Sequence, residues 1–543
     1  MVRPGIRRAP VVLAAGAILA ASLAAPAQAA QTGITLETTP KGASNTLAGH
    51  SFTAYRIGGY ADVVKANGRV SSFDVEAADQ GTTKAWLAAA LRSAGLTVKA
   101  GCDEAGTIAG TDDAATLRRV ADLLATSASK PAATVADVAG FGTRATLNVP
   151  DGYYLVTDAN KDTLPMIVGT KVDGMDLATG TLGTLTVKTR TFTLDKTLVH
   201  ADGSESKTGS VRVGDTATYH IAFTMPYMVG ADASVRIVDQ MTGQTFKDMT
   251  GATIDGRDVT AQVGVVKARA GGLTAIPAKS SGLPATTLHA GSVGFNLDRL
   301  ATAANGGKRV VITVRATITS TADNHHIEAP TGHVAWKDLS TGTVYTPDPP
   351  TSRADVYTGD LKVTKTSTAD RTARIPDAGF KIRDKGTGKW LSWSASGWSD
   401  AADEAHATEF RTGDANHDGK VTAAEASASA KGDATFPGLS SGTYEIRETT
   451  APEGFVKSNL GLPSLTATLD AEKGTVTYQG SDLPNLTTVE GGRAVVADMT
   501  NLTQLPTTGG VWGVVTAVSV MAAFAGLAFG VRRATRASDG VAA

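Results

Sequence analysis

The sequence predicts a mostly β protein made of tandem β-sandwich domains, with helices inserted into the first domain. Aromatic residues are scarce (5%), glycine is plentiful (59 residues), and threonine and valine recur in alternating patterns, which is typical of several small β domains. A length of 543 residues fits three or four domains. The net charge of −1, with no basic block before the C-terminal tail, gives no indication of nucleic acid binding.

The N-terminus predicts export. Residues 1–29 have arginines, then an apolar run from Val11 to Leu23, then Ala27-Gln28-Ala29 as a cleavage site, which are the parts of a signal peptide. The chain has one cysteine, Cys102, so no intramolecular disulfide can form. We interpret Cys102 as a free thiol, because no thioester motif accompanies it. An exported protein without disulfides needs another source of robustness.

The C-terminus, residues 502–543, predicts a membrane anchor with a motif ahead of it. Leu505-Pro506-Thr507-Thr508-Gly509 precedes an uncharged run from Val511 to Val531, and arginines 532, 533 and 536 follow. About twenty apolar residues suffice to cross a bilayer as a helix, and the arginines would hold the C-terminus on the cytoplasmic side. A bare tail anchor would not explain the pentapeptide.

Residues 30–190 read as a β domain with a helical insertion. The expected strands are 51–57, 145–149 and 153–156, with a turn at Pro150-Asp151-Gly152. The expected helices are 84–96 and 111–125; the second has leucines and valine at helical spacing and Thr111 or Asp112 as its N-cap.

Residues 191–355 read as a second β domain with charges on its inward faces. In the first strand, 191–200, period-two alternation puts Lys196 on one face with Leu194 and Leu198. Asp239 likewise shares a face with Val235 and Ile237. A buried charge is costly unless it is paired, neutralised or reacted. A salt bridge at the surface edge is the simpler alternative for each residue alone.

Residues 356–501 read as a third β domain with the same feature. Lys365 shares a face with Leu361 and Val363 on the first strand, and Glu448 shares one with Tyr444 and Ile446. On the last strand we expect Asn501 to face inward, in line with Val495, Ala497 and Met499.

These inward residues permit a self-made cross-link. Burial lowers the pKa of a lysine and raises that of a glutamate. A neutral amine can attack an amide carbonyl that a protonated carboxyl group polarises. The product is a Lys–Asn isopeptide bond, with release of ammonia and no cofactor. By the loop-entropy estimate used for disulfides, closing the third domain in this way is worth roughly 5 kcal/mol.

Several motifs resemble those of one protein family. Tyr444-Glu-Ile-Arg-Glu448 followed by Ala451-Pro-Glu-Gly-Phe455 resembles the E-box of collagen-adhesin B-type (Cna-B) domains, and Leu361 to Lys365 resembles their opening. Leu194-Asp-Lys196 with Gly214-Asp215, Tyr219 and Asp239 resembles a fimbrial isopeptide-forming domain. LPxTG with its span and basic tail resembles a cell-wall sorting signal. The whole chain thus resembles Gram-positive major shaft pilins.

The resemblance implies a structural subunit with three immunoglobulin-like domains. It implies that Lys365, Glu448 and Asn501 form one isopeptide site and that Lys196 and Asp239 belong to another. It also implies that a sortase cuts after Thr508 and passes the acyl group to an amine. The implied partners are sortase, other pilin subunits, peptidoglycan and a host glycan or matrix protein. The implied location is the cell wall or fimbria, after a transient membrane stage.

Two departures from the family pattern leave alternatives open. The middle domain should have an inward asparagine on its last strand, but that position falls near Pro330, and the nearest asparagine is Asn324. Either Asn324 serves through a shifted loop or no bond forms. Arg190 stands where the acceptor lysine of the pilin motif would align, which leaves Lys188 either as the acceptor or as an ordinary exposed lysine.

Residues 414–425 fit a twelve-residue calcium loop. The matching residues are Asp414, Asn416, Asp418, Gly419, Lys420, Thr422 and Glu425. A helix over 421–430 is expected to follow. The alternative is an acidic, solvated insertion, and no organic cofactor is expected.

Two functions remain in competition. The first is a polymerised shaft subunit, and the second is a monomeric or pilus-tip adhesin anchored to the wall; the role of Lys188 separates them. An enzyme acting on an external substrate finds no support, because the sequence has no Ser/His/Asp arrangement, phosphate loop or recognisable catalytic carboxylate pair.

Overall fold

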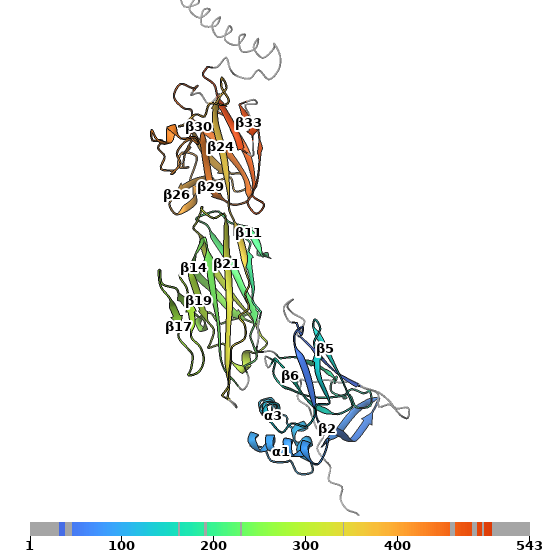
Figure 1. Ribbon diagram of the computed structural model, residues 1–543. Coiled ribbons are helices and arrows are strands. Elements are labelled where there is room, and N and C mark those ends of the chain that lie inside the picture. Colours follow the sequence, from blue (N-terminus) through green and yellow to red (C-terminus); the bar gives the residue numbers. More distant parts are fainter. Residues whose placement is uncertain are drawn as a thin grey trace, which may run out of the picture.

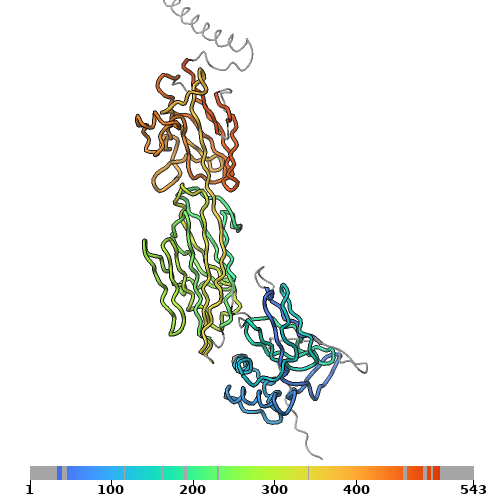
Figure 2. The backbone as a smooth tube through the Cα atoms, in the orientation of Figure 1, coloured from blue at the N-terminus to red at the C-terminus, as the bar shows by residue number. Residues whose placement is uncertain are grey.

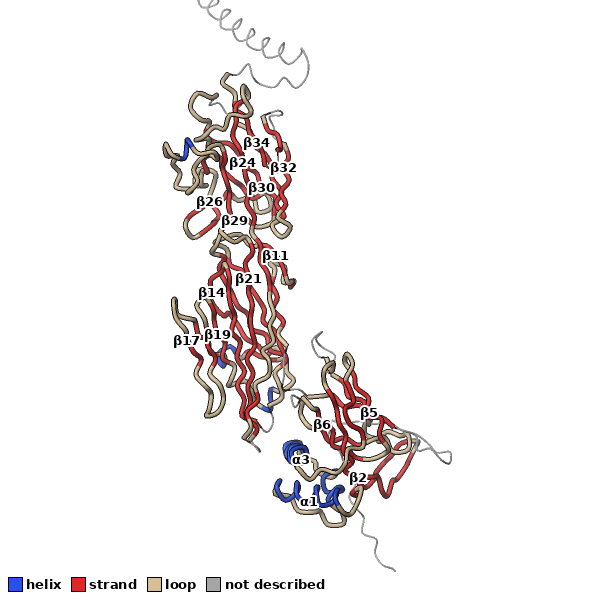
Figure 3. Tube along the Cα trace, in the orientation of Figure 1, coloured by secondary structure: helices blue, strands red, loops and turns tan. Residues whose placement is uncertain are grey.

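The structure is a computed structural model that describes most of the chain. The described residues are 32–38, 46–160, 163–188, 190, 193–228, 231–339, 342–456, 462–480, 486–490 and 493–501. The expected signal peptide and sorting signal lie outside them. Within these ranges no helix is long and apolar enough to cross a membrane. The fold is mostly β, and its longer helices lie in the first domain (Figure 3).

The first domain has two hydrophobic cores. The helices pack with one sheet around the first core, and a smaller sheet covers the second. Its strands are β1 (Thr32–Glu37), β2 (Ser51–Ala66), β3 (Arg69–Ala77), β4 (Val135–Ala139), β5 (Arg144–Val149), β6 (Tyr153–Asp158), β7 (Met166–Gly169) and β8 (Thr184–Thr186). The sheet orders are β5-β1-β8 and β3-β2-β6-β7, with β4 beside β2. The three predicted strands are therefore present.

The helical insertion is α1 (Thr82–Ala94), α2 (Glu104–Ala109) and α3 (Ala114–Thr126). Glycine suits the left-handed position after a helix, and Gly95 ends α1 there with a φ of 76°. The Asp113 carboxylate caps α3 by accepting from the Thr116 amide at 2.7 Å. The expected caps, Thr111 and Asp112, were therefore placed too early. Trp86 donates to the Leu124 carbonyl at 3.2 Å and joins α1 to α3.

The second domain is a sandwich of two sheets. Its strands are β9 (Asp195–Val199), β10 (Glu205–Ser206), β11 (Thr208–Ser210), β12 (Thr216–Thr224), β13 (Ala231–Thr242), β14 (Gln244–Ile254), β15 (Arg257–Asp258), β16 (Gly264–Lys267), β17 (Thr274–Ile276), β18 (Thr286–Leu288), β19 (Ser292–Asn296), β20 (Arg309–Ile318), β21 (His325–Asp338), β22 (Val344–Tyr345) and β23 (Ala354–Tyr357). One sheet has the order β10-β9-β12-β20-β14-β15, and the other has β11-β23-β21-β13-β19-β16. Alternating apolar residues of β12, β13, β20 and β21 fill the space between them.

The third domain is also a two-sheet sandwich. Its strands are β24 (Gly359–Ser367), β25 (Gly379–Asp384), β26 (Trp390–Ser394), β27 (Gly397–Ala401), β28 (Phe410–Arg411), β29 (Asp433–Leu439), β30 (Gly442–Thr450), β31 (Ser464–Asp470), β32 (Thr475–Gln479), β33 (Thr487–Glu490) and β34 (Arg493–Asp498). The orders are β29-β24-β34-β33 and β27-β26-β25-β30-β31-β32. The first strand, β24, and the last, β34, run parallel side by side.

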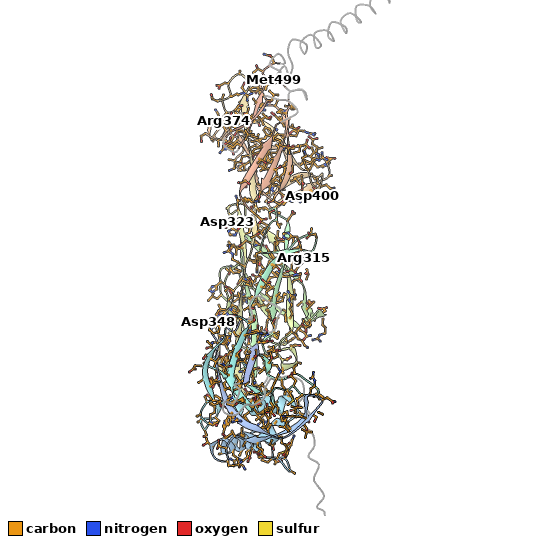
Figure 4. The ribbon with its side chains drawn as sticks, turned by 90° about the vertical axis from the view of Figure 1, so that its right-hand side faces the viewer. Arg315, Asp323, Asp348, Arg374, Asp400 and Met499 are labelled. Atoms are coloured by element: carbon orange, nitrogen blue, oxygen red, sulfur yellow. The ribbon has the colours of Figure 1, made fainter. Side chains whose placement is uncertain are left out.

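The second and third domains are stacked end to end, and the first lies beside the lower end of the second (Figures 1 and 2). Backbone hydrogen bonds cross the boundary between the stacked domains. The Val213 amide donates to the Gly438 carbonyl at 2.9 Å, and the Trp398 amide donates to the Val213 carbonyl at 2.8 Å. Arg212 forms an ion pair with Asp400 at 2.9 Å, and Asp400 lies at this boundary in Figure 4.

Candidate functional site: buried lysine–carboxylate clusters

The middle domain buries one lysine against two acids. The Lys196 Nζ lies 2.6 Å from an Asp239 carboxylate oxygen and 2.9 Å from a Glu328 carboxylate oxygen, and all three side chains are 0% exposed. The ring of Tyr219 covers the amine, with its centroid 4.6 Å from Nζ. We call these three charged residues the middle cluster.

Strand alternation brings the middle cluster together. Lys196 is on β9, in one sheet, and faces β13 and β21 of the other. In the antiparallel pairing of β13 with β21, Asp239 is opposite Pro330 and Met241 is opposite Glu328. Because side chains two residues apart share a face, Asp239 and Glu328 project from neighbouring strands to the same face of their sheet. Lys196 contacts both of them from the facing sheet.

The charges of the middle cluster do not balance if every group is ionised. Burial, and then the nearby Asp239 carboxylate, raise the pKa of Glu328 well above its ordinary value. Burial acts to lower the pKa of Lys196, but Asp239 and Glu328 outweigh it and the pKa is raised. Of the alternatives expected for this buried lysine, the unreacted cluster therefore shows pairing with carboxyl groups. The favoured state is an ammonium with one carboxylate and one neutral carboxyl group.

The third domain holds a matching arrangement, which we call the C-terminal cluster. The Lys365 Nζ lies 2.6 Å from a Glu448 oxygen and 2.5 Å from an Asp498 oxygen. The side chains of Lys365 and Glu448 are 0% exposed, and that of Asp498 is 1% exposed. Burial raises the pKa of Glu448 to about 8, and the Asp498 carboxylate adds to this rise while Lys365 opposes it.

The C-terminal cluster has a different geometry from the middle one. Lys365 on β24 is opposite Val496 of the parallel strand β34, and Asp498 follows two residues along the same strand. Glu448 arrives from β30 in the facing sheet. Lysine and aspartate therefore link adjacent strands of one sheet, while the glutamate closes the cluster from the other side of the core.

The structure corrects the expectation for Asn501. Strand β34 ends at Asp498, and Asn501 lies beyond it with an exposed side chain, so Asp498 takes the place expected for asparagine. Val495, Ala497 and Met499 are as buried as Val496 and Asp498. Because both faces of this strand are buried, the alternation of apolar residues could not show which face meets Lys365.

The structure also corrects the expectation for Asn324. Asn324 is exposed and precedes β21. The residue that reaches Lys196 is Glu328, two positions before Pro330 on the inward face. The sequence contained this signal, since the same alternation that points to Pro330 continues to Glu328. The prediction missed it because only an asparagine was sought.

Lys188 is exposed and lies close to the second domain. Its Nζ is 5.4 Å from the centre of the Tyr227 ring. Arg190, which was expected to stand at the position of an acceptor lysine, is 4% exposed, and its guanidinium lies 5.6 Å from the Trp336 ring centre. Among the described residues of the first domain no lysine is buried, so a cluster of this kind is confined to the other two domains within the described ranges.

The expected calcium loop has its carboxylates turned to its own backbone. Asp414, which is 4% exposed, accepts from the Asp418 and Gly419 amides at 3.2 and 2.8 Å. Glu425 accepts from the Ala415 and Thr422 amides at 3.3 and 2.9 Å. Across the described chain no three His, Cys, Asp or Glu side chains converge as metal ligands. The expected helix over 421–430 is wrong, because only a 3₁₀ turn, Glu425–Ser427, forms.

One comparison with protein families covers the third domain. Residues 359–482 match the family model of the SpaA prealbumin-like fold domain. This match spans β24 to β32 of the third domain. The match includes Lys365 and Glu448 and ends before Asp498, so the last member of the C-terminal cluster rests on the structure alone.

Solved structures similar to the chain include several major pilins. The chain is 13% identical to the major pilin subunit BcpA of Bacillus cereus, covering 86% of this chain and 99% of that one with a TM-score of 0.37. It is 14% identical to the full-length major pilin SpaD of Corynebacterium diphtheriae. That alignment covers 86% of this chain and 97% of SpaD, with a TM-score of 0.40. The chain is 14% identical to the full-length major pilin RrgB of Streptococcus pneumoniae. That alignment covers 69% of this chain and 87% of RrgB, with a TM-score of 0.38. No curated protein matches the chain.

Proposed function

We propose that the protein is the shaft subunit of a covalent, wall-anchored pilus. The observation that carries the proposal is the C-terminal cluster: Lys365 and Asp498 are on the first and last strands of the domain that precedes the sorting signal. An amide between them would carry tension through the domain without loading its other strands. A SpaA-like domain next to LPxTG supports the same function.

The subunits would be joined by sortase. The enzyme would cut between Thr508 and Gly509 and transfer the Thr508 acyl group to the Lys188 amine of the next subunit, or to peptidoglycan at the base. Exposure of Lys188 supports its role as acceptor. Arg190 is an unsuitable acceptor because it is packed against Trp336 and because its guanidinium stays protonated. The assembled pilus would present host-binding surfaces for a glycan or matrix protein.

The internal bond of the third domain would join Lys365 to Asp498 instead of to Asn501. Glu448 contacts the same amine and would relay protons. It would pass its own proton to the Asp498 carboxylate and take one from the Lys365 ammonium, so that the free Lys365 nitrogen attacks a neutral Asp498 carboxyl carbon. The Asp498 hydroxyl leaves as water, and the pair becomes a neutral amide. The subunit would act in this way only on its own chain.

Polymerisation gives the test of this function. The full chain is co-expressed with a pilin-polymerising sortase, and surface extracts are separated in denaturing gels. We expect a ladder of covalent multimers that Lys188→Arg abolishes, because arginine cannot be acylated in its place. Lys362→Arg, at another exposed lysine, should leave the ladder unchanged. A single wall-linked species from the unaltered chain would support the monomeric adhesin instead.

The residue types of the 414–425 loop support a second, smaller proposal, a weak calcium site. Backbone contacts of Asp414 and Glu425 already hold the loop in a compact form, and extracellular calcium loops can work at millimolar concentrations. Millimolar calcium added to chelator-treated protein should raise Tm, and Glu425→Gln should remove the rise. An unchanged Tm would contradict the site.

A further inference from the structure

We propose that the middle domain closes its own cross-link as an amide between the Lys196 Nζ and the Glu328 side-chain carboxyl carbon, with water as the leaving molecule. The inference rests on the self-cross-linking described under the proposed function and assigns its chemistry in a domain that lacks an inward asparagine. It makes glutamate, through a γ-glutamyl-lysine bond, the acyl donor.

The environment of the three groups favours condensation. Lys196, Asp239 and Glu328 are all 0% exposed, so none of the three side chains is in contact with bulk water. One oxygen of Asp239 and one of Glu328 have no hydrogen-bond partner among the residues that the structure describes. In water, condensation of an amine with an acid is opposed by the favourable hydration of the two ions. Burial removes that hydration, so a neutral amide becomes the favoured form of the pair.

The reach of the two acid side chains favours Glu328 over Asp239 as the acyl donor. Bond formation must bring the Lys196 nitrogen roughly 2 Å closer to a carboxyl carbon than hydrogen-bond contact allows. Both acids project from the sheet that faces Lys196. Glu328 has one more side-chain torsion than Asp239, so it can follow the amine without moving its strand. Asp239 is the closer contact, at 2.6 Å, which suits the group that takes the ammonium proton.

The protonation states agree with these roles. Amines attack neutral carboxyl groups and not carboxylates, and burial raises the pKa of Glu328 well above its ordinary value. The carboxylate of Asp239 then faces the ammonium across a hydrogen bond. The cluster therefore contains a neutral electrophile and an ionised base in contact with one amine.

The reaction balances within the cluster. Asp239 takes a proton from the Lys196 ammonium, and the free amine attacks the Glu328 carbonyl carbon. The tetrahedral adduct loses its hydroxyl group as water, with one proton relayed from the nitrogen through Asp239. An ammonium, a carboxyl group and a carboxylate become an amide, one water molecule and a neutral Asp239. No oxidant, metal or cofactor is consumed.

A buried amide nearby provides the rival acyl donor. Gln244 is 7% exposed, and its side-chain oxygen accepts from the Tyr219 hydroxyl at 2.8 Å. The Lys196 amine lies over the ring of Tyr219, whereas Gln244 is hydrogen-bonded to the hydroxyl group at the end of that ring. A Lys196–Gln244 bond would release ammonia instead of water, which intact mass distinguishes.

The experiment is intact mass and peptide mapping of the full secreted chain, with the Glu328→Gln variant beside it. We expect a peptide pair that joins Lys196 to Glu328 with loss of one water. In Glu328→Gln the same bond should form with loss of ammonia. Because both routes end in one product, the two cross-linked proteins should have the same mass. A variant that kept its unlinked mass would overturn the proposal.

Further variants separate the roles. Asp239→Asn should stop bond formation while leaving Lys196 and Glu328 in place, and Glu205→Gln, at a partly exposed acid of the same domain, should change nothing. Three outcomes would overturn this inference alone: a bond from Lys196 to Gln244, a bond from Lys196 to Asp239, or an unlinked Lys196 in a chain whose Lys365 is linked. Lys365 and Lys196 both unlinked would overturn the proposed self-cross-linking as well, while the multimer ladder tests polymerisation separately.

Discussion

At the scale of residues, the two clusters share their parts and differ in their placement. Each has a buried lysine, two carboxyl groups and an aromatic ring near the amine, Tyr219 in one and Phe380 in the other. In the middle cluster both acids face the lysine from the opposite sheet, whereas Asp498 is on a strand beside that of Lys365. A bond in the middle domain would therefore cross the core, and one in the third domain would join two strands of a sheet.

The role of Asp498 can be tested with three substitutions. Asp498→Ala should leave the third domain unlinked and lower its free energy of unfolding by about 5 kcal/mol, the loop-closure value for a chain segment of this length. Asp498→Asn should still link, with release of ammonia, and should retain stability. Asn501→Ala should leave mass and stability unchanged. Calorimetry and intact mass measure these outcomes; a destabilised, unlinked Asn501→Ala protein would restore the original assignment.

Alternation in the sequence predicted two of the three charged residues in each cluster. Lys196, Asp239, Lys365 and Glu448 stand out because a charged residue takes the place of an apolar one on an inward face. Asp498 could not be predicted in this way, since both faces of β34 are buried. Glu328 was on the predicted face, but the family pattern directed attention to amides. The chemistry of the acyl donor therefore required the three-dimensional contacts.

At the scale of elements, the joint between the second and third domains is closely packed. Only Thr358, 2% exposed, separates β23 from β24. Glycines allow the two backbones to meet: a Cβ on Gly397 would lie 2.6 Å from the Gly214 nitrogen and from the Val213 carbonyl. Short connection and close backbone contact together predict that these domains move as one unit.

Gly397→Ala tests this joint, with Gly388→Ala as its matched control. Both glycines have positive φ, 101° and 72°, so alanine should cost about 1–2 kcal/mol at either position. A Cβ on Gly388 would meet nothing closer than an Arg383 nitrogen at 3.7 Å. We expect only Gly397→Ala to loosen the joint, seen as a broader shape distribution in small-angle scattering. Equal effects of the two variants would contradict a rigid joint.

The ends of elements were less predictable than their existence. Two of the three helices of the first domain, α1 and α3, were predicted, whereas the short helix α2 was not. Helix α3 begins after Asp113, later than expected, because that side chain reaches the Thr116 amide. The calcium-like loop was expected to lead into a helix, but Glu425 binds the Thr422 amide and hydroxyl and the chain makes a single turn. Local side-chain hydrogen bonds decided both boundaries.

At the scale of the whole molecule, the proposed bonds define a route for tension. Force would enter at Lys188, cross from Lys196 to Glu328, continue into β24, cross from Lys365 to Asp498 and leave at Thr508. The first domain precedes Lys188 and lies outside this route. Met499, next to Asp498, lies at the far end of the third domain from the second (Figure 4), so the route runs along both stacked domains.

This route contains one segment that can lengthen. Glu328 and Ala354 are paired neighbours on β21 and β23. The chain between them follows the rest of β21 to Asp338 and then returns to β23. If that loop is pulled off the sheet, residues 329–353 release roughly 80 Å of extended chain. The third domain has no such slack, since Lys365 and Asp498 are in direct contact.

Single-molecule stretching between residue 188 and the sorting motif should therefore show one extension of roughly 80 Å per subunit. Glu328→Ala should lengthen this step several-fold, because the whole chain from Lys196 to Ala354 would then unravel, whereas Asp498→Ala should add a separate step from the third domain. Deleting the first domain up to Thr186 should leave the pattern unchanged. An unaltered subunit that gave no extension, or one as long as that of Glu328→Ala, would contradict the route.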